Sequence, residues 1–213
     1  MKIILLLLAG FLLWIIVGNL RQKPGNRFDI YFGVPGSGKT TFAAYLAKKR
    51  IKRNGLVLSN VNIKGTYEVE RSDIGNYMIK DCLLLIDEAG IDYNNRNFAD
   101  KKEKMSKEEI YFYKYHRHYN VDIAIFSQGY DDMDKKLRTL ATRYYIVKKS
   151  ILPGFITRKL INKVIGIDDN TKQIIDKYSF AILGTKWIYC PKLWKMFNST
   201  SYKEMPTKEF KMY

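Results

Sequence analysis

The stretch Gly33-Val34-Pro35-Gly36-Ser37-Gly38-Lys39-Thr40 decides the fold of this chain. It matches G-x-x-x-x-G-K-[ST], the P-loop or Walker A pattern, in which backbone N–H groups surround the phosphates of a nucleotide. Glycines in the loop allow the backbone to approach the phosphates closely. The pattern predicts that residues 33–41 bind ATP, Thr41 included, with Lys39 on the β- and γ-phosphates and the Thr40 hydroxyl on Mg²⁺.

The residues on either side of this loop favour the same interpretation. Residues 28–32 (FDIYF) are apolar and aromatic, as in a buried strand, and residues 41–49 (TFAAYLAKK) are typical of a helix. A helix that begins at the loop directs the positive end of its dipole at bound phosphate. The sequence therefore predicts a strand, loop and helix in the order that nucleotide binding requires.

A second motif ends in an acidic pair whose first residue, Asp87, lies 48 positions after Lys39. The apolar run Leu83–Ile86 ends in Asp87 and Glu88, which is the Walker B pattern. The carboxyl ends of parallel strands meet at one edge of a sheet, where ligands bind. We therefore expect Asp87 to hold Mg²⁺, directly or through water, together with Thr40, and Glu88 to act as the general base on the attacking water.

Further strands complete the expected sheet. Residues 56–61, 121–126 and 143–147 have strand character, and residues 131–142 favour a helix. The strand at 121–126 ends in Ser127-Gln128, and a polar residue at this place between the two Walker strands senses the γ-phosphate, so Gln128 is a candidate catalytic residue. The fold class predicted is α/β: a P-loop NTPase of the additional-strand, catalytic-glutamate type, with a parallel sheet flanked by helices.

Two other local patterns carry expectations. Ser106 and Glu109 form a capping box that opens a helix bearing several aromatic residues, most of which we expect to pack inward. Residues 180–183 and 186–189 flank Gly184-Thr185, which suggests a hairpin. Cys82 and Cys190 lie far apart in the sequence and indicate neither a disulfide framework nor a zinc site.

The N-terminal region predicts a membrane anchor. Residues 3–20 carry no charge, and as a helix they span about 27 Å, close to the hydrocarbon thickness of a bilayer. A secretory signal peptide is the competing interpretation, but its apolar region is shorter and no A-x-A cleavage site is evident. Positive charge is heavier after the segment than before it, which places the body in the cytoplasm. We expect a single-pass protein of the inner (cytoplasmic) membrane, with an anchor at 1–22, an ATPase core at 23–150 and a basic, β-containing extension at 151–213.

The charge of the chain indicates a polyanionic partner. The formal net charge is +16, from 37 Lys and Arg against 21 Asp and Glu. Residues 144–213 hold 13 of the basic residues and five of the acidic ones. Nucleic acid and anionic lipid both remain open as partners of this segment. Because nothing in the sequence reads base identity, contact with DNA would be to the backbone and sensitive to salt.

Taken together, these motifs resemble the zonula occludens toxin (Zot)-like proteins, which include the assembly ATPases of filamentous phages. The resemblance covers residues 28–200 and rests on four stretches: GVPGSGKT at 33–40, LLLIDEA at 83–89, HRHYNVDIAIFSQ at 116–128 and DDMDKKLR at 131–138. It implies an inner-membrane motor that couples ATP hydrolysis to the export of single-stranded phage DNA or nucleoprotein, with phage coat or assembly proteins as partners. In the phage proteins the span follows the ATPase domain, whereas here the apolar segment precedes it.

Two other functions remain open at this stage. One is a DNA translocase or conjugation-type coupling ATPase of a mobile element. The other is a nucleotide-gated scaffold that does not hydrolyse ATP, and the presence of Glu88 and Gln128 argues against this second function. Motors of this class are homo-oligomers that hydrolyse ATP at subunit interfaces, where an arginine from a neighbour stabilises charge on the γ-phosphate. We expect Arg138 to fill this role, with Arg143 as the alternative.

Overall fold

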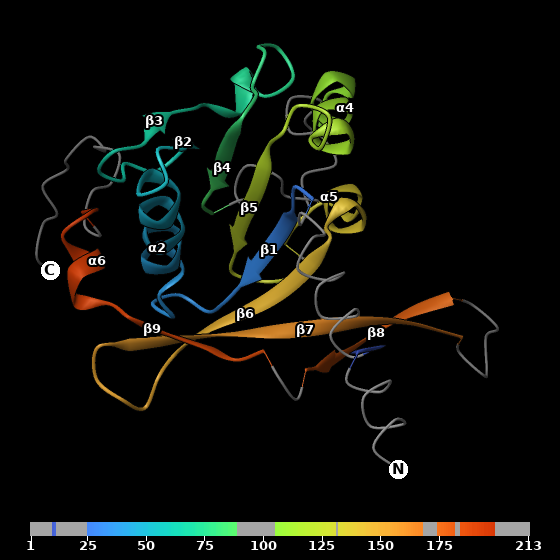
Figure 1. The fold of residues 1–213 in the computed structure, drawn as a ribbon. Helices are drawn as coiled ribbons and strands as arrows, with labels where there is room; N and C mark the ends of the chain where they lie inside the picture. The colour runs from blue at the N-terminus through green and yellow to red at the C-terminus, as the bar shows by residue number, and fades with distance from the viewer. Residues whose placement is uncertain are drawn as a thin grey trace, which may run out of the picture.

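The computed structural model describes residues 10–11, 25–88, 105–130, 132–167, 174–181 and 184–198. Their strands form one nine-stranded sheet in the order β3-β2-β4-β5-β1-β6-β7-β8, with β9 also paired to β7 (Figure 1). The strands are β1 (Phe28–Phe32), β2 (Leu56–Ser59), β3 (Tyr67–Glu68), β4 (Cys82–Ile86), β5 (Asp122–Ser127), β6 (Arg143–Lys149), β7 (Phe155–Ile167), β8 (Ile174–Phe180) and β9 (Lys186–Tyr189).

The central strands are parallel. β1 pairs with β5 on one side and β6 on the other, and β5 pairs with β4. β5 therefore lies between the P-loop strand and the Walker B strand, as the sequence predicts. Because β2, β4, β5, β1 and β6 all run the same way, their carboxyl ends share one edge, and the P-loop leaves β1 at this edge.

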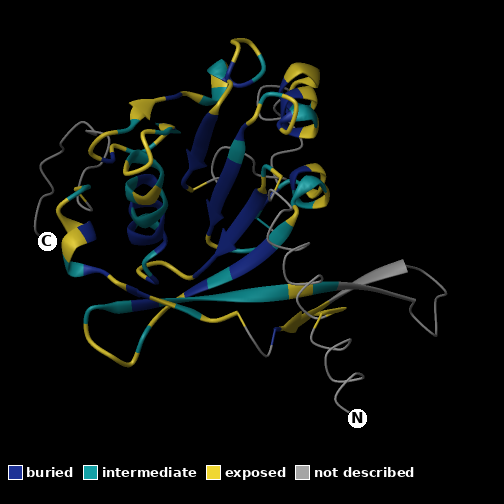
Figure 2. Cartoon of the chain, in the orientation of Figure 1, coloured by how far each residue is buried: buried dark blue, intermediate teal, exposed yellow. Residues whose placement is uncertain are grey.

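Helices cover both faces of the sheet. α2 (Lys39–Ile51) packs on one face, and α4 (Lys107–Tyr115) and α5 (Lys135–Leu140) pack on the other (Figure 1). Side chains alternate between the faces along each strand, so β1 sends Ile30 to the α4 side and Tyr31 to the α2 side. Figure 2 shows that burial is deepest in these central strands, where every residue of β1 and β4 is buried. An apolar layer thus covers each face of the sheet, which explains why the sequences of its central strands are nearly continuous hydrophobic runs.

α4 begins where its sequence predicts, whereas α5 is shorter than expected at both ends. Ser106 accepts a hydrogen bond from the backbone N–H of Glu109, and the Glu109 carboxylate accepts one from Ser106, so the capping box opens α4. Of the aromatic residues there, Phe112 and Tyr113 are buried, whereas Tyr111 is exposed. The expected helix over 131–142 is wrong in extent: α5 has six residues, begins after the Asp134 cap and ends before Ala141, whose backbone is extended.

The sheet continues past β6 with antiparallel strands. β7 is 13 residues long and pairs with β6 on one side, while β8 and β9 pair end to end with its other side. The expected hairpin is therefore wrong, because β8 and β9 bond to β7 and not to each other. β7 crosses the carboxyl edge beside α2 (Figure 1).

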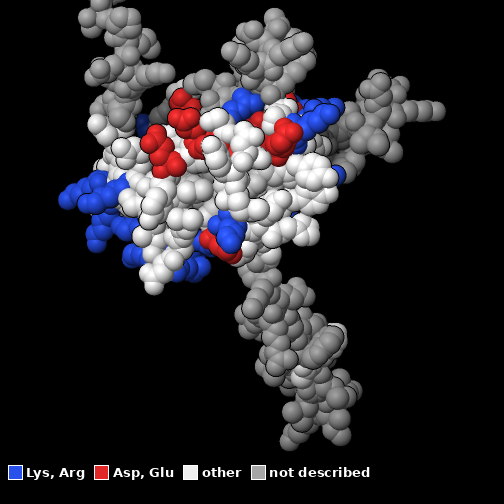
Figure 3. All heavy atoms as spheres, turned by 90° about the horizontal axis from the view of Figure 1, so that it is seen from above, with Lys and Arg blue, Asp and Glu red and all other residues white. Residues whose placement is uncertain are grey.

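The described part of the chain leaves several sequence predictions as they stand. No helix among its residues is long and apolar enough to cross a membrane. The expected anchor lies outside these residues, except for Gly10 and Phe11. The division into three regions stays a prediction. Cys82 and Cys190 are both free and buried. Seen from above, one group of basic side chains lies at the left of the face, and acidic side chains lie in several places, some of them beside further basic ones (Figure 3).

Candidate functional site

The P-loop wraps tightly between β1 and α2. Ser37 donates its backbone N–H to the Val34 carbonyl at 3.0 Å, and Gly33 N–H bonds to the Ser127 carbonyl of β5 at 3.2 Å. Gly38 has a φ of +98°, and a Cβ there would lie 2.7 Å from Cγ2 of Ile156. Glycine is needed at Gly38 for both reasons, since the left-handed backbone disfavours a side chain and β7 leaves no room for one.

Lys39 and Thr40 lie at the first turn of α2 with their functional atoms in the loop. Lys39 is buried, and its Nζ donates to the carbonyls of Gly33 at 2.7 Å and Val34 at 3.3 Å. Burial lowers the pKa of Lys39, and the nearby carboxylates of Asp87 and Glu88 oppose this shift. A buried ammonium held by carbonyls at the start of a helix is a cation placed to receive phosphate oxygens.

Thr40 joins the two Walker motifs. Its Oγ1 donates a hydrogen bond to Oδ2 of Asp87 at 2.7 Å, although the two residues are 47 positions apart in the sequence. Burial raises the pKa of Asp87, while the hydrogen bonds from Thr40 and from the Glu88 backbone N–H counteract the rise. The sequence-predicted metal ligands, Thr40 and Asp87, are thus in direct contact.

This contact fits a magnesium ion. Mg²⁺ takes oxygen ligands and is held by one or two carboxylates together with substrate phosphates, without a cage made only of protein groups. The hydroxyl of Thr40 and the carboxylate of Asp87 supply two such oxygens at one point beside the loop. The described residues contain no group of three or more His, Cys, Asp or Glu that would hold a metal alone. Water and the phosphate oxygens of a nucleotide would supply the other ligands of the ion. Ser37 Oγ, buried in the loop and without a hydrogen-bond partner among the described residues, is a further polar atom there.

Glu88 follows Asp87 at the carboxyl end of β4. It is exposed, and its φ of +55° is uncommon for a residue other than glycine. Its backbone N–H donates to Oδ1 of Asp87 at 3.0 Å. The Glu88 side chain is therefore open to solvent next to Asp87, and its expected role as a base stays a prediction.

Asn60 is a site residue that the sequence analysis missed. From the end of β2, its side-chain amide donates to the Asp87 carbonyl at 2.9 Å and accepts from the Asp87 backbone N–H at 2.8 Å. This pair of hydrogen bonds fixes the backbone of Asp87, the expected metal ligand. The signal that was available is its place: Asn60 is the last residue but one of the strand expected over residues 56–61 of the same sheet.

Lys149 is a second missed residue. It ends β6, and its Nζ lies 4.0 Å from the position that a Cβ would take at Gly36. β6 adjoins β1, so its end reaches the same edge as the P-loop. Lys149 therefore adds an exposed positive charge beside the loop that is expected to receive phosphates.

Two further predicted residues are Gln128, which directly follows β5, and Arg138 of α5. Ser127 is buried and paired, while Gln128, the next residue, is exposed at the end of β5. The Arg138 guanidinium lies 4.1 Å from the centre of the Tyr130 ring, and that ring contacts Phe32 of β1. The expected action of Arg138 on a neighbouring subunit stays a prediction.

Arg143, the alternative, is engaged within its own chain. Its guanidinium makes two hydrogen bonds to the carboxylate of Asp29, at 3.0 and 2.9 Å, from Nε and Nη2. Asp29 is the second residue of β1, so the pair lies about 13 Å from the P-loop along the strand. The pair ties the start of β6 to β1 and places Arg143 away from the nucleotide edge.

Comparison with solved structures found similar folds at low identity. The N-terminal domain of zonular occludens toxin from Neisseria meningitidis matches with a TM-score of 0.49 and 19% identity, covering 82% of this chain and 100% of that chain. The genome packaging NTPase B204 from Sulfolobus turreted icosahedral virus 2, in complex with ATP-gammaS, matches with a TM-score of 0.46 and 11% identity, covering 76% and 100%. FlaH from Methanocaldococcus jannaschii, a flagellar accessory protein, matches with a TM-score of 0.44 and 13% identity, covering 72% and 90%.

The sequence itself gives the assignment. Comparison with curated proteins found no match. The family model described as Zonular occludens toxin (Zot) matches residues 30–204, which include both Walker motifs and most of the described sheet. With this match over more than half of its length, the chain belongs to the Zot family.

Proposed function

We propose that this protein is a membrane-anchored ATPase motor that hydrolyses ATP to export single-stranded DNA during assembly of a filamentous-phage-like virion. The observation that carries the enzymatic part is the 2.7 Å hydrogen bond between Thr40 and Asp87, which brings the Walker A and Walker B motifs to one point. The family match supports the choice of motor. The expected membrane segment and the basic charge of the chain support anchoring and a polyanionic cargo.

Each residue of the site has a part in hydrolysis. The N–H groups of the loop and of the first turn of α2 bind the phosphates, and Lys39 exchanges its loop carbonyls for phosphate oxygens. Thr40 and Asp87 hold Mg²⁺, which when bound neutralises charge on the β- and γ-phosphates. Glu88 takes the proton of the attacking water, and Gln128 lies at the end of the neighbouring strand, where it contacts the γ-phosphate.

The family of motors to which we assign the chain acts as an oligomer, and this supports a trans role for an arginine. Since Arg143 lies at the start of β6, away from the edge that holds the P-loop, Arg138 is the stronger candidate. Glu88→Gln and Arg138→Ala each leave the nucleotide contacts in place and remove a different half of an interface site. A mixture of the two variants therefore regains turnover in part, because some interfaces combine both intact groups. Mixed oligomers with no more activity than the separate variants would remove Arg138 from this role.

The choice of cargo is tested by ATP turnover of the detergent-solubilised full chain, without nucleic acid, with a single strand or with a duplex of the same length. We expect the single strand to stimulate turnover most, equally for unrelated sequences, and the stimulation to fall steeply with salt. Lys39→Ala should abolish ATP binding and serves as the control for contaminating ATPases. Stronger stimulation by the duplex would favour the alternative, a DNA translocase or conjugation-type coupling ATPase.

A further inference from the structure

A basic cavity of about 460 Å³ lies on the α2 face, away from the P-loop. The end of α2, the starts of β1 and β5, and the strands β7 and β9 enclose it, and none of its lining residues belongs to the P-loop. Along α2, Arg50 lies about 16 Å from Lys39. Six basic and two acidic residues line the cavity: Arg27, Lys49, Arg50, Arg53, Arg158 and Lys186, with Asp29 and Asp122.

The two carboxylates of the cavity are already engaged. Asp29 accepts both hydrogen bonds of Arg143, which is not a lining residue. Asp122 accepts from Nη1 of Arg50 at 3.5 Å and from the backbone N–H of Arg27 at 3.0 Å. Because Arg143 offsets the charge of Asp29 from outside the lining, the net positive charge around the cavity exceeds the difference between its basic and acidic lining residues.

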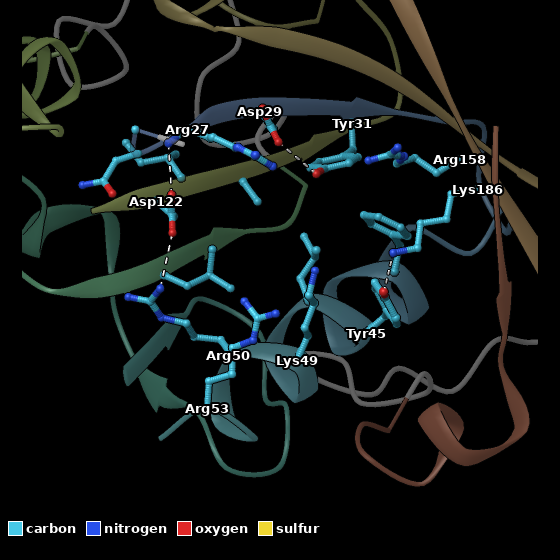
Figure 4. A pocket seen from close by; sticks show the side chains of 17 residues that line it. Arg27, Asp29, Tyr31, Tyr45, Lys49, Arg50, Arg53, Asp122, Arg158 and Lys186 are labelled. Atoms are coloured by element: carbon cyan, nitrogen blue, oxygen red, sulfur yellow. Dashed lines mark hydrogen bonds and ion pairs between the residues drawn. The ribbon is translucent and has the colours of Figure 1, made fainter. Parts of the chain in front are cut away.

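Several of the cations have spare donors. Lys49, Arg53 and the Arg27 side chain make no hydrogen bond or ion pair with another described residue. Figure 4 shows Lys49, Arg50 and Arg53 rising from the end of α2 toward the sheet, and Arg158 and Lys186 entering from another side.

Two guanidinium nitrogens in this cavity are also buried without an acceptor. Nε of Arg50 and Nε of Arg158 have no hydrogen-bond partner among the described residues. Arg158 is held in place by stacking 4.1 Å from the centre of the Tyr145 ring. Both atoms are shielded from solvent, and Nε of Arg50 lies against Gly55, so they add fixed positive charge at the wall of the cavity and are not donors that a ligand in the cavity would reach.

The sequence places this cavity beside the expected membrane segment. Gly25, Asn26 and Arg27 line it, and Gly25 is only five residues beyond Leu20, the last residue of the apolar run. Five extended residues span at most about 18 Å. If residues 3–20 cross the bilayer, the cavity lies within reach of the headgroup layer on the side of the body.

We propose that this cavity binds the phosphate headgroup of an anionic phospholipid in the membrane that holds the anchor. The inference rests on the anchoring part of the proposed function and is independent of ATP hydrolysis. A bound headgroup accepts hydrogen bonds from the cations of α2 and fixes the end of α2 and the strand β7 against the membrane surface.

The test is native mass spectrometry of the full chain in nonionic detergent with equal amounts of phosphatidylglycerol and phosphatidylcholine and no nucleotide. The variant Lys49→Gln/Arg53→Gln removes two exposed cations of the cavity. The control Lys135→Gln/Lys136→Gln removes the same charge from exposed positions on α5, which lies on the opposite face. Cooperative thermal unfolding of both variants is checked first.

We expect the unmodified chain and the α5 control to retain phosphatidylglycerol in preference to phosphatidylcholine. The cavity variant should lose this preference by about tenfold or more, because each basic residue near an anionic membrane surface contributes on the order of 1 kcal/mol. An equal loss in both variants, or no preference in the unmodified chain, would overturn the proposal. So would displacement of the lipid by inorganic phosphate, or a cavity variant that keeps the lipid but loses binding to an oligothymidylate.

ATP turnover measured on the same samples separates this proposal from the proposed function. A chain that hydrolyses ATP but retains no phosphatidylglycerol refutes the lipid site alone. A chain that retains the lipid but hydrolyses no ATP refutes the ATPase and leaves the lipid site standing.

Discussion

Asn60→Ala tests whether the neighbouring strand holds the metal ligand in place. The substitution removes the two hydrogen bonds, 2.8 and 2.9 Å long, between the Asn60 amide and the backbone of Asp87. At about 0.5–1.5 kcal/mol each, their loss lowers the free energy of unfolding by about 1–3 kcal/mol. Groups that orient a metal ligand without touching the ion typically change metal affinity by about 10- to 100-fold. We therefore expect the Mg²⁺-dependent part of ATP affinity to fall by this factor while affinity without Mg²⁺ stays constant.

The assay is a titration of ATP with and without Mg²⁺, together with thermal unfolding. Asn62→Ala is the matched control, because Asn62 is exposed in the same loop two residues further on. Asn62→Ala should change neither the Mg²⁺-dependent affinity for ATP nor the free energy of unfolding. Equal Mg²⁺-dependent affinity in the unmodified chain and Asn60→Ala would refute the positioning role, as would an equal loss in Asn62→Ala.

Three further predictions concern single charges. Lys149→Ala should weaken ATP binding by about three- to tenfold, because it removes a cation beside the P-loop. Lys148→Ala is the control, because the Lys148 side chain lies on the other face of the same strand, and it should not weaken binding. Equal affinities of the two variants in a nucleotide titration would contradict this. Arg143→Gln removes the guanidinium that pairs with the buried Asp29, so it should lower the free energy of unfolding by about 1–3 kcal/mol. ATP turnover per folded molecule should stay unchanged. A loss of turnover without a loss of stability would return Arg143 to the catalytic candidates. Burial lowers the pKa of His116 from its usual 6.5, and the charge of Arg117 acts in the same direction. The native state therefore disfavours the protonated ring, so the free energy of unfolding should decline as the pH falls below about 6.5. His116→Asn should flatten that decline between pH 7.5 and 5 in thermal unfolding, and an unchanged pH dependence would refute the assignment.

The sequence predicts the nucleotide edge well because its signals are local. The P-loop and Asp87 each follow directly from a short apolar strand, and parallel strands bring such ends together. The place of β5 between the two Walker strands also follows from the order of motifs. No comparable local signal marks Asn60, since its role depends on the pairing of β2 with β4. The same holds for Lys149, which reaches the loop only because β6 lies beside β1.

The wrong predictions have a common origin in long-range pairing. Gly184-Thr185 resembles a hairpin turn, but β7 is long enough to pair with both flanking strands at once. The helix before β6 ends early because the Thr142 backbone N–H bonds to the Phe28 carbonyl at the start of β1. In the same way, the bond between Arg143 and Asp29 joins residues 114 positions apart, and no local signal predicts it.

The most direct test of the account is ATP binding and single-turnover hydrolysis by the unmodified chain and by Glu88→Gln. Glu88 lies beside the bonded pair of Thr40 and Asp87 but makes no contact that binding of phosphate requires. The account predicts that Glu88→Gln binds Mg²⁺–ATP with about the affinity of the unmodified chain and hydrolyses it about 10²- to 10⁴-fold more slowly, as expected for loss of a general base. Hydrolysis by Glu88→Gln at the unmodified rate, or bound ATP that the unmodified chain fails to hydrolyse, would contradict it.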